Sequence, residues 1–413
     1  MRLDEIDLTD LDRFEAGFPH ETFTVLRREA PVWFHPPTPH TPGGEGFWVL
    51  SCHADVLAAG TDATALSSQG GGGRAGGGTL IEDLPAQLAA GVLLNFMDDP
   101  RHRRIRRLVT PVVSPRSLAV MEHELRDRTA AIVDAAVAKG ECDFVVDVAA
   151  ELPLQAIARL LGVPQEDRHA LFTWASATLD YAGRELGEQN EQTVAAAAAL
   201  HEYGSSLVEE KRARPGDDML SAVVHGVVRD DDGSAGTTSH AEQLMFFNLL
   251  IAAGSETTRN TIAVGIATLG ARSDQWESVR ADRALVPGAV EEMLRWASST
   301  PYNRRTATRD LEIGGQAVRA GDKVTLWWAS ANRDESVFDD PFRFDVRRDP
   351  NPHLTFGHGA HFCLGASLAR LEIRLVLEAL LDRVRTVESA GPVEWTRSNK
   401  HTGVRHMPVV LAT

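Results

Sequence analysis

The chain has 413 residues, of which 43% are hydrophobic and 24% are charged, and its formal net charge is −16. This composition is typical of a globular protein with a substantial core, and the negative charge argues against nucleic acid or an anionic membrane as the partner of the whole surface. The three cysteines (Cys52, Cys142 and Cys363) form no disulfide framework and no apolar run approaches the roughly 20 residues that cross a bilayer, so we expect a cytoplasmic protein without a membrane anchor.

The first distinctive segment is the glycine-rich stretch "SSQGGGGRAGGGTL", with seven glycines among residues 70–78. So many glycines predict a mobile loop or a flexible surface linker. The next is "RHRRIRR", residues 101–107, whose five arginines would suggest nucleic-acid binding in isolation. The acidic net charge and the lack of interleaved aromatic residues argue against that interpretation.

A largely helical region follows. Residues 111–214 are rich in periodic Ala and Leu, and they predict helices with breaks at Pro153, Pro164 and Pro215. Residues 227–239 are polar and predict a turn.

A single long helix is predicted after this turn. Ser239 and Glu242 have the spacing of a capping box, and the apolar pattern then continues to about Gly270. Such a helix would be about 45 Å long at 1.5 Å per residue. Because it is apolar around most of its circumference, we expect it to cross the centre of a large domain.

The polar stretch "AAGSETTRN", residues 252–260, interrupts that apolar helix. Glycine costs about 1 kcal/mol relative to alanine inside a helix, and a buried Glu or Thr without a partner is also costly. The stretch is therefore either a solvated stripe on an amphipathic helix or a functional cluster. The apolar residues on both sides favour the second interpretation, because they would bury the polar side chains.

The last third of the chain changes from helical to strand-like periodicity. Pro287 is predicted to open a helix, "PGAVEEMLRW", in which Glu292 and Arg295 share one face and can pair. On spacing alone this is a surface ion pair worth under about 1 kcal/mol. The segments "RDLEIGG" and "QAVRAGDKVTLWW" then predict strands with a turn at Gly314-Gly315. The fold class is therefore mainly α with minor β.

The loop "TFGHGAHFCLGA" places Cys363 directly before another predicted helix. That helix is marked by leucines at i, i+4, i+7 and i+11, namely Leu364, Leu368, Leu371 and Leu375. Three interpretations compete: a zinc site with His358, His361 and Cys363, a buried structural cysteine, or a thiolate ligand of a metal cofactor. The crowding glycines and the helix N-terminus, which stabilises an anionic sulfur, favour the third.

Residues 356–365 resemble the haem-thiolate loop of the cytochrome P450 family, which reads F-x-x-G-x-[HR]-x-C-x-G. Residues 253–258 resemble the family's oxygen-binding signature, [AG]-G-x-[DE]-T-[TS], with Glu256 in place of the more frequent Asp. The resemblance implies the cytochrome P450 fold, a triangular helical prism with small β-sheets and with haem between the long central helix and the helix after the cysteine. It implies one domain over residues 1–413, with β-rich portions near 20–60, 305–330 and 385–413 and a helical core near 95–300 and 363–385.

The same resemblance assigns roles to single residues. Cys363 would be the metal ligand, and its thiolate would favour O–O bond cleavage. Glu256 and Thr257 would be the catalytic pair, the first for proton delivery and the second for holding dioxygen and an ordered water. Cofactor-binding residues would be His102, Arg106, Arg305, Phe356, His361, Gly365, Ala253 and Gly254, the last two letting the long helix pass close to the haem. Structural residues would be Glu292, Arg295 and Arg348.

The implied activity is a monooxygenase that hydroxylates a hydrophobic small molecule, using haem b, O2 and electrons from NAD(P)H through a ferredoxin reductase and a ferredoxin. The remaining arginines of residues 101–107 would form a basic face for the ferredoxin. The C-terminal half looks most similar to bacterial members that act on steroids, terpenoids or branched lipids. Alternatives are a tailoring oxidase of polyketides or carrier-bound peptides in secondary metabolism, a haem-binding sensor without turnover, and a peroxide-driven or isomerising haem-thiolate enzyme.

The substrate pocket is expected to involve residues 70–95 and 171–200. Further expected lining residues are Met245, Leu249, Ala253, Thr300, Tyr302 and Val404. Most of these are apolar, which suits a hydrophobic substrate. Asn248, Tyr302 and Asn303 would give a more polar substrate its contacts. The competing interpretation for each position is core packing.

Overall fold

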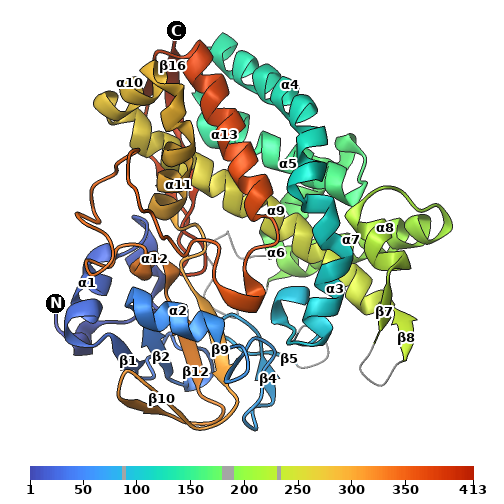
Figure 1. Ribbon diagram of the computed structural model, residues 1–413, viewed down its shortest axis with the longest axis vertical. Helices are drawn as coiled ribbons and strands as arrows, with labels where there is room; N and C mark the ends of the chain where they lie inside the picture. Colours follow the sequence, from blue (N-terminus) through green and yellow to red (C-terminus); the bar gives the residue numbers. More distant parts are fainter. Residues whose placement is uncertain (86–89, 179–189, 230–233) are drawn as a thin grey trace.

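The computed structural model describes residues 1–85, 90–178, 190–229 and 234–413 of the chain. Helices make up most of it, and the main sheet lies to one side (Figure 1). The helices are α1 (His20–Glu29), α2 (His53–Thr61), α3 (Arg101–Val109), α4 (Pro115–Lys139), α5 (Glu151–Leu161), α6 (Arg168–Thr178), α7 (Glu191–Ala213), α8 (Met219–His225), α9 (His240–Gly270), α10 (Ser273–Ala281), α11 (Val286–Ala297), α12 (Trp328–Ala331) and α13 (Ala366–Arg383). The strands are β1 (Val32–His35), β2 (Phe47–Leu50), β3 (Leu66–Ser67), β4 (Gly76–Gly77), β5 (Leu84–Pro85), β6 (Glu141–Asp143), β7 (Val227–Arg229), β8 (Ala235–Thr237), β9 (Asn303–Ala307), β10 (Leu311–Ile313), β11 (Gln316–Val318), β12 (Lys323–Leu326), β13 (Thr386–Ser389), β14 (Glu394–Trp395), β15 (Val404–His406) and β16 (Pro408–Ala412). The predicted fold class, mainly α with minor β, is confirmed.

The main sheet combines strands from the N-terminal region with strands from residues 303–326. Its order is β1-β2-β12-β9-β3, in which β12 runs parallel to β2 and the other neighbours are antiparallel. β10 and β11 form the predicted hairpin, and Gly314 and Gly315 adopt positive φ in its turn. In β9, Arg305 lies opposite Val324 of β12. The sheet therefore holds Arg305 on a rigid element.

Helix α9 crosses the middle of the molecule, where it contacts α5, α11 and α13 among others (Figure 1). It begins at the predicted capping box: the Glu242 N–H donates to the Ser239 hydroxyl at 3.2 Å, and the Ser239 N–H donates to the Glu242 carboxylate at 2.7 Å. Residues 258–266 are all buried, which confirms the prediction of a long central helix. Neither α9 nor any other helix in the described ranges is long and apolar enough to cross a membrane.

The loop before α13 is closed on itself. The Cys363 N–H donates to the Phe356 carbonyl at 2.9 Å, and Gly357 and Gly359 between them adopt positive φ values of 68° and 73°. Residues with side chains rarely adopt this conformation. A Cβ at Gly359 would also lie 2.4 Å from the Gly60 carbonyl oxygen of α2. The glycines around the cysteine therefore shape its loop.

A buried ion cluster ties α11 to the segment before the cysteine loop. Arg295 donates to both carboxylate oxygens of Glu292 at 2.7 Å, and Arg348 approaches the same carboxylate at 3.4 Å. Arg295 also donates to the carbonyls of Asn332 and Pro341, each at 2.9 Å. The side chains of Glu292 and Arg295 have no exposed surface, so this is not the surface pair that spacing alone suggests.

Several local predictions need correction. Pro153 does not break a helix. It is the third residue of α5, where a missing N–H is tolerated, and a π-helical turn at Val145–Ala149 precedes this helix. The polar segment 227–239 contains strands β7 and β8. Residues 20–60 hold helices α1 and α2 beside β1 and β2. Pro287 is the second residue of α11, one position later than predicted.

The glycine-rich stretch packs against the main sheet. Arg74 donates through Nε to the Gly321 carbonyl at 2.9 Å and through Nη1 to Glu45 and Asp83, at 2.9 and 2.6 Å. Strand β4 of this stretch also pairs with β5. The stretch is therefore attached to the protein at several points, which does not fit a flexible surface linker.

Candidate functional site

The site begins with an accessible stripe on α9. Met245, Leu249, Ala253 and Thr257 follow one another at intervals of four residues, which places them on one helical face. Each keeps some exposed surface although α9 lies in the middle of the molecule, whereas neighbours on other faces, such as Phe247, are buried. The stripe is therefore an accessible face of a central helix. Three of its four side chains are apolar, which suits a hydrophobic ligand.

Cys363 differs from the other two cysteines. Burial raises the pKa of Cys52 and of Cys142 to about 11, as expected for structural thiols. Cys363 is surrounded by protein but has an accessible surface. Burial raises the pKa of this thiol, while the Gly365 N–H and the charges of Arg106 and Arg370 act in the opposite direction. Its surroundings are therefore electropositive.

Basic side chains gather beside this cysteine. The rings of His102 and His361 lie 4.2 Å apart between centroids, and the Arg106 guanidinium donates to the carbonyl of Phe362, the residue before Cys363. Burial lowers the pKa of His361 to about 2, and the nearby charges of Arg305, His102 and Arg106 add to the effect. Burial likewise lowers the pKa of Arg305 to about 10. We call these four residues, His102, Arg106, Arg305 and His361, the cationic cluster.

The cationic cluster has few acidic partners in the described part of the chain. Asp99 pairs with His102 at 3.2 Å, and Asp98 acts on Arg305 and His102 through its charge. A buried guanidinium such as that of Arg305 needs an anionic partner. A haem carries two propionates at one edge and an iron that accepts a thiolate, so this set of donors fits it. An added Cβ at Gly365 would meet nothing within 4 Å, which leaves room beside the sulfur.

Glu256 lies buried on α9 and bonds to α6. The Ser176 hydroxyl donates to its Oε1 at 2.7 Å, and the Arg259 guanidinium pairs with its Oε2. Burial raises the pKa of Glu256, although Arg259 and Ser176 each lower it. The Arg259 guanidinium carbon lies 5.4 Å from the centre of the Phe172 ring. The solvated-stripe interpretation is therefore wrong, and a carboxyl with a raised pKa is suited to proton exchange.

Thr257 donates its hydroxyl hydrogen to the Ala253 carbonyl one turn earlier, at 2.9 Å. Its lone pairs therefore remain available to a donor on the accessible face of α9. Gly254 has a packing role that its sequence signature does not indicate. A Cβ there would lie 2.7 Å from Cδ1 of Ile157, so this glycine allows α9 to pack on α5.

The structure separates the expected pocket residues into two groups. Met245, Leu249, Ala253 and Thr300 keep exposed surface. Tyr302 and Val404 do not, so these two predictions are wrong: the Tyr302 ring stacks 4.6 Å from Trp327 in an aromatic core, and Val404 is 1% exposed in the main core. Within the two expected lining segments, residues 86–89 and 179–189 lie outside the described residues.

The zinc interpretation finds no support. Among the residues that the structure describes, no three His, Cys, Asp or Glu side chains gather closely enough to hold a metal ion. His361 instead packs against His102, and the Cβ of His358 lies near Gly60.

Sequence reasoning missed Ser176, Arg259 and Arg370. Arg259 and Arg370 lie at i+3 from Glu256 and at i+7 from Cys363, helical spacings that could have revealed them. Ser176 belongs to α6, 80 residues before Glu256 in the chain. Since only the packing of α6 on α9 brings the two together, no local pattern marks it.

Comparison with known proteins supports a single family. The sequence model described as "Cytochrome P450" matches residues 141–404. The chain is 50% identical to cytochrome P450 126 of Mycobacterium tuberculosis over 410 residues, covering 99% of this chain and 98% of the relative. It is 38% identical to a methyl-branched lipid omega-hydroxylase of the same species (94% and 90% covered) and 36% identical to a steroid C26-monooxygenase of Rhodococcus jostii (98% and 85% covered). Among solved structures, cytochrome P450 CYP268A2 of Mycobacterium marinum in complex with pseudoionone is similar with a TM-score of 0.89, 36% identity and 99% of both chains covered.

Proposed function

This chain belongs to the cytochrome P450 family, and from that premise we propose that it hydroxylates a lipid, steroid or terpenoid substrate. The fold is that of the family, and the protein is a haem-iron monooxygenase that uses O2 and electrons from redox partners. One observation carries the assignment of the site: an accessible cysteine lies directly beside the cationic cluster. The electron source that we propose is NAD(P)H, through a ferredoxin reductase and a ferredoxin, and the cofactor that we propose is haem b.

Cys363 would hold the haem iron through its sulfur, and the cationic cluster would hold the propionates. When bound, the haem supplies the oxygen activation and the C–H chemistry. Phe356 would pack beside the sulfur, since its carbonyl already accepts the Cys363 N–H at 2.9 Å. The exposed arginines of α3, such as Arg103 and Arg107, would meet an acidic ferredoxin.

Glu256 and Thr257 would deliver protons to the oxygen chemistry. Glu256 holds a carboxyl whose raised pKa lets it bind and release a proton, and Arg259 and Ser176 keep it in place. Through its free lone pairs, the Thr257 hydroxyl would accept a hydrogen bond from a water on the accessible face of α9. The apolar side chains of Met245, Leu249 and Ala253 would contact the substrate and exclude bulk water.

Thiolate ligation is tested by spectroscopy. The reduced protein with carbon monoxide should show the long-wavelength Soret band of a sulfur-ligated haem, and Cys363→Ser should lose it. A wild-type protein that binds haem but lacks this band would overturn the assignment of Cys363.

The role of Thr257 is tested by measuring how much product forms for each pair of electrons consumed. Thr257→Ala should consume electrons at a similar rate but form several-fold less hydroxylated product and more peroxide. Thr261→Ala is the matched control, because Thr261 makes the same backbone bond one turn later, to the Thr257 carbonyl at 2.9 Å, but is buried. Equal coupling in both variants would remove Thr257 from the proposed pair.

A tailoring oxidase acting on a more polar substrate is the second candidate. Oδ1 of Asn248 is buried on α9 and has no hydrogen-bond partner among the described residues. Such an atom suits a substrate hydroxyl or amide. A spectral binding screen that includes branched lipids, steroids, terpenoids and polyketides separates the two candidates by the class that displaces the iron's distal water.

A further inference from the structure

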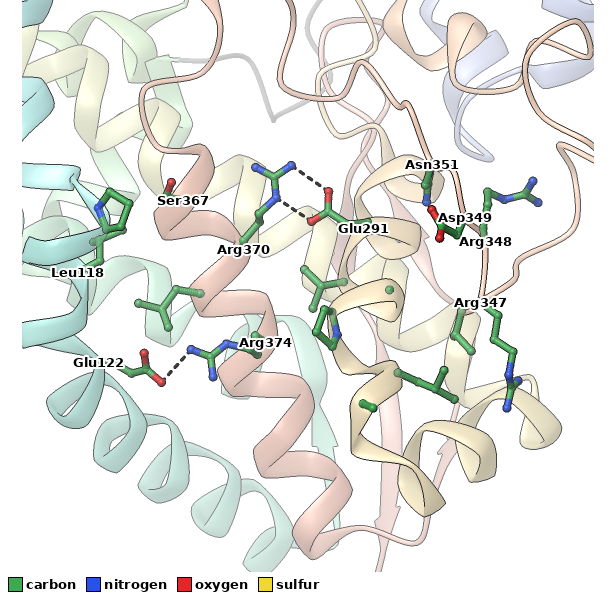
Figure 2. Close-up of a pocket in the computed structure, with 18 of the residues that line it drawn as sticks. Leu118, Glu122, Glu291, Arg347, Arg348, Asp349, Asn351, Ser367, Arg370 and Arg374 are labelled. Atoms are coloured by element: carbon green, nitrogen blue, oxygen red, sulfur yellow. Dashed lines mark hydrogen bonds and ion pairs between the residues drawn. The ribbon is translucent and has the colours of Figure 1, made fainter.

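An ion pair between α11 and α13 lies next to the cysteine loop. Arg370 donates through Nε and Nη2 to the two carboxylate oxygens of Glu291, at 2.7 and 2.8 Å. Figure 2 shows this pair bridging the two helices at the border of a cavity of about 790 Å³. Paired, planar contacts of this kind fix the orientation of a guanidinium more firmly than a single bond does.

The same guanidinium contacts the residue that closes the cysteine loop. Its central carbon lies 4.6 Å from the centre of the Phe356 ring, within the range of a cation–π interaction. The carbonyl of Phe356 accepts the Cys363 N–H at 2.9 Å. Arg370 therefore packs on one face of the Phe356 ring, and Phe356 in turn bonds the backbone of Cys363.

Glu291 has a second partner that also adjoins Phe356. Nε2 of His353 lies 3.1 Å from the Glu291 carboxylate, and Nδ1 of His353 accepts the Thr355 N–H at 3.4 Å. With Nδ1 accepting, the proton sits on Nε2 and points to Glu291. The rings of His353 and Phe356 lie 6.1 Å apart. Glu291 thus aligns two groups that contact the Phe356 ring.

We propose that Arg370 and Glu291 form a charge pair that sets the reduction potential of the iron bound at Cys363. Arg370 is a positioning residue that places Phe356 and contributes a fixed positive charge, and Glu291 offsets part of that charge. The inference rests on the proposed thiolate ligation by Cys363. Reduction adds one negative charge at the iron, so a nearby cation favours the reduced form and a nearby anion favours the oxidised form.

The two partners therefore have opposite expected effects. Arg370→Gln should shift the redox equilibrium about threefold toward ferric iron, which is roughly 30 mV at 59 mV per tenfold for one electron. Glu291→Gln leaves the Arg370 charge uncompensated. This variant should shift the redox equilibrium by a similar factor in the opposite direction, toward ferrous iron. Arg370→Lys keeps the charge but loses the planar stacking and the paired bonds, so its shift should be smaller than that of Arg370→Gln.

The experiment is an optical redox titration of the haem-loaded variants. Arg374→Gln is the matched control: Arg374 lies one turn further along α13 and bonds Glu122 at 2.8 Å (Figure 2). Its potential should equal that of the wild type. The carbon monoxide spectrum of each variant is recorded first, since loss of the thiolate band in the wild type would overturn the proposed function instead.

Two results would overturn the charge pair. One is an Arg370→Gln protein with an intact thiolate band and the potential of Arg374→Gln. The other is a Glu291→Gln protein whose potential falls or stays unchanged. Should Arg370→Gln fail to take up haem, the sign of the Glu291→Gln shift alone decides.

Discussion

Two groups of buried charge flank the site, and they are built in opposite ways. In the cluster of Glu292, Arg295 and Arg348, the anion meets both cations, and backbone carbonyls take up the remaining donors of Arg295. In the cationic cluster, basic groups face one another. Burial lowers the pKa values of all four, and neighbouring positive charges add to the effect at His102 and His361. A buried charge group whose positive and negative members compensate one another stabilises the fold. A group that is left with excess charge indicates an anionic ligand.

Breaking the complete cluster should have the largest effect. Arg295→Gln leaves the Glu292 carboxylate buried with one partner fewer, which costs about 3–5 kcal/mol. That is a large part of the stability of a typical protein, so the expected result is loss of folded protein or a sharply lower urea midpoint. Arg126→Gln, which removes an exposed pair with Glu378, should cost less than about 1 kcal/mol. Similar urea midpoints for the two variants would show that the buried cluster stabilises the fold no more than the exposed pair does.

Neutralising the cationic cluster should separate stability from ligand binding. Arg305→Gln removes a buried charge and one bond to the Arg304 carbonyl, so the unfolding free energy of the apoprotein should stay within about 1 kcal/mol of the wild type. Haem affinity should fall roughly tenfold to a hundredfold, as expected for a lost charge-assisted hydrogen bond of about 1.5–3 kcal/mol. Haem titration of the apoprotein measures this. A variant that is unstable but binds haem normally would show that Arg305 serves the fold.

The smallest expected effect is a pH dependence of the apoprotein. His361 has a pKa of about 2 when folded against 6.5 ordinarily, so the unfolded chain binds the proton first as the pH falls. Stability should therefore be complete above pH 6.5 and decline below it, by at most about 1.4 kcal/mol per pH unit. Urea unfolding at pH 7 and pH 5 measures this difference, which should shrink in His361→Gln. With haem bound, nearby propionates would favour the protonated form of His361. The stability of the haem-loaded protein should therefore depend less on pH.

The sequence predicted the parts of the molecule whose causes are local. The capping box at Ser239 and Glu242 set the start of α9, and the leucine spacing set the helix after Cys363, because both depend on residues within a few turns. The polar stretch 252–260 could be recognised as buried because its own neighbours are apolar.

Errors arose where a distant segment decides the outcome. Tyr302 lies in the segment expected to complete the pocket, but its ring packs against Trp327, the residue directly after β12. The close contact of Gly254 with Ile157, nearly a hundred residues earlier, was missed for the same reason. Ser176, the partner of Glu256 on α6, likewise has no local pattern that marks it, because only the packing of α6 on α9 brings the two together.

The attachment of the glycine-rich stretch through ion pairs has a consequence for its response to salt. Glycines offer no side chains to pack, so this stretch is attached largely through Arg74. Arg74 pairs with Glu45 and Asp83. Arg304 and Lys323 of the sheet pair with these carboxylates as well. Charges near a surface are screened over about 8 Å at physiological salt. The stiffness of this segment should therefore vary with ionic strength.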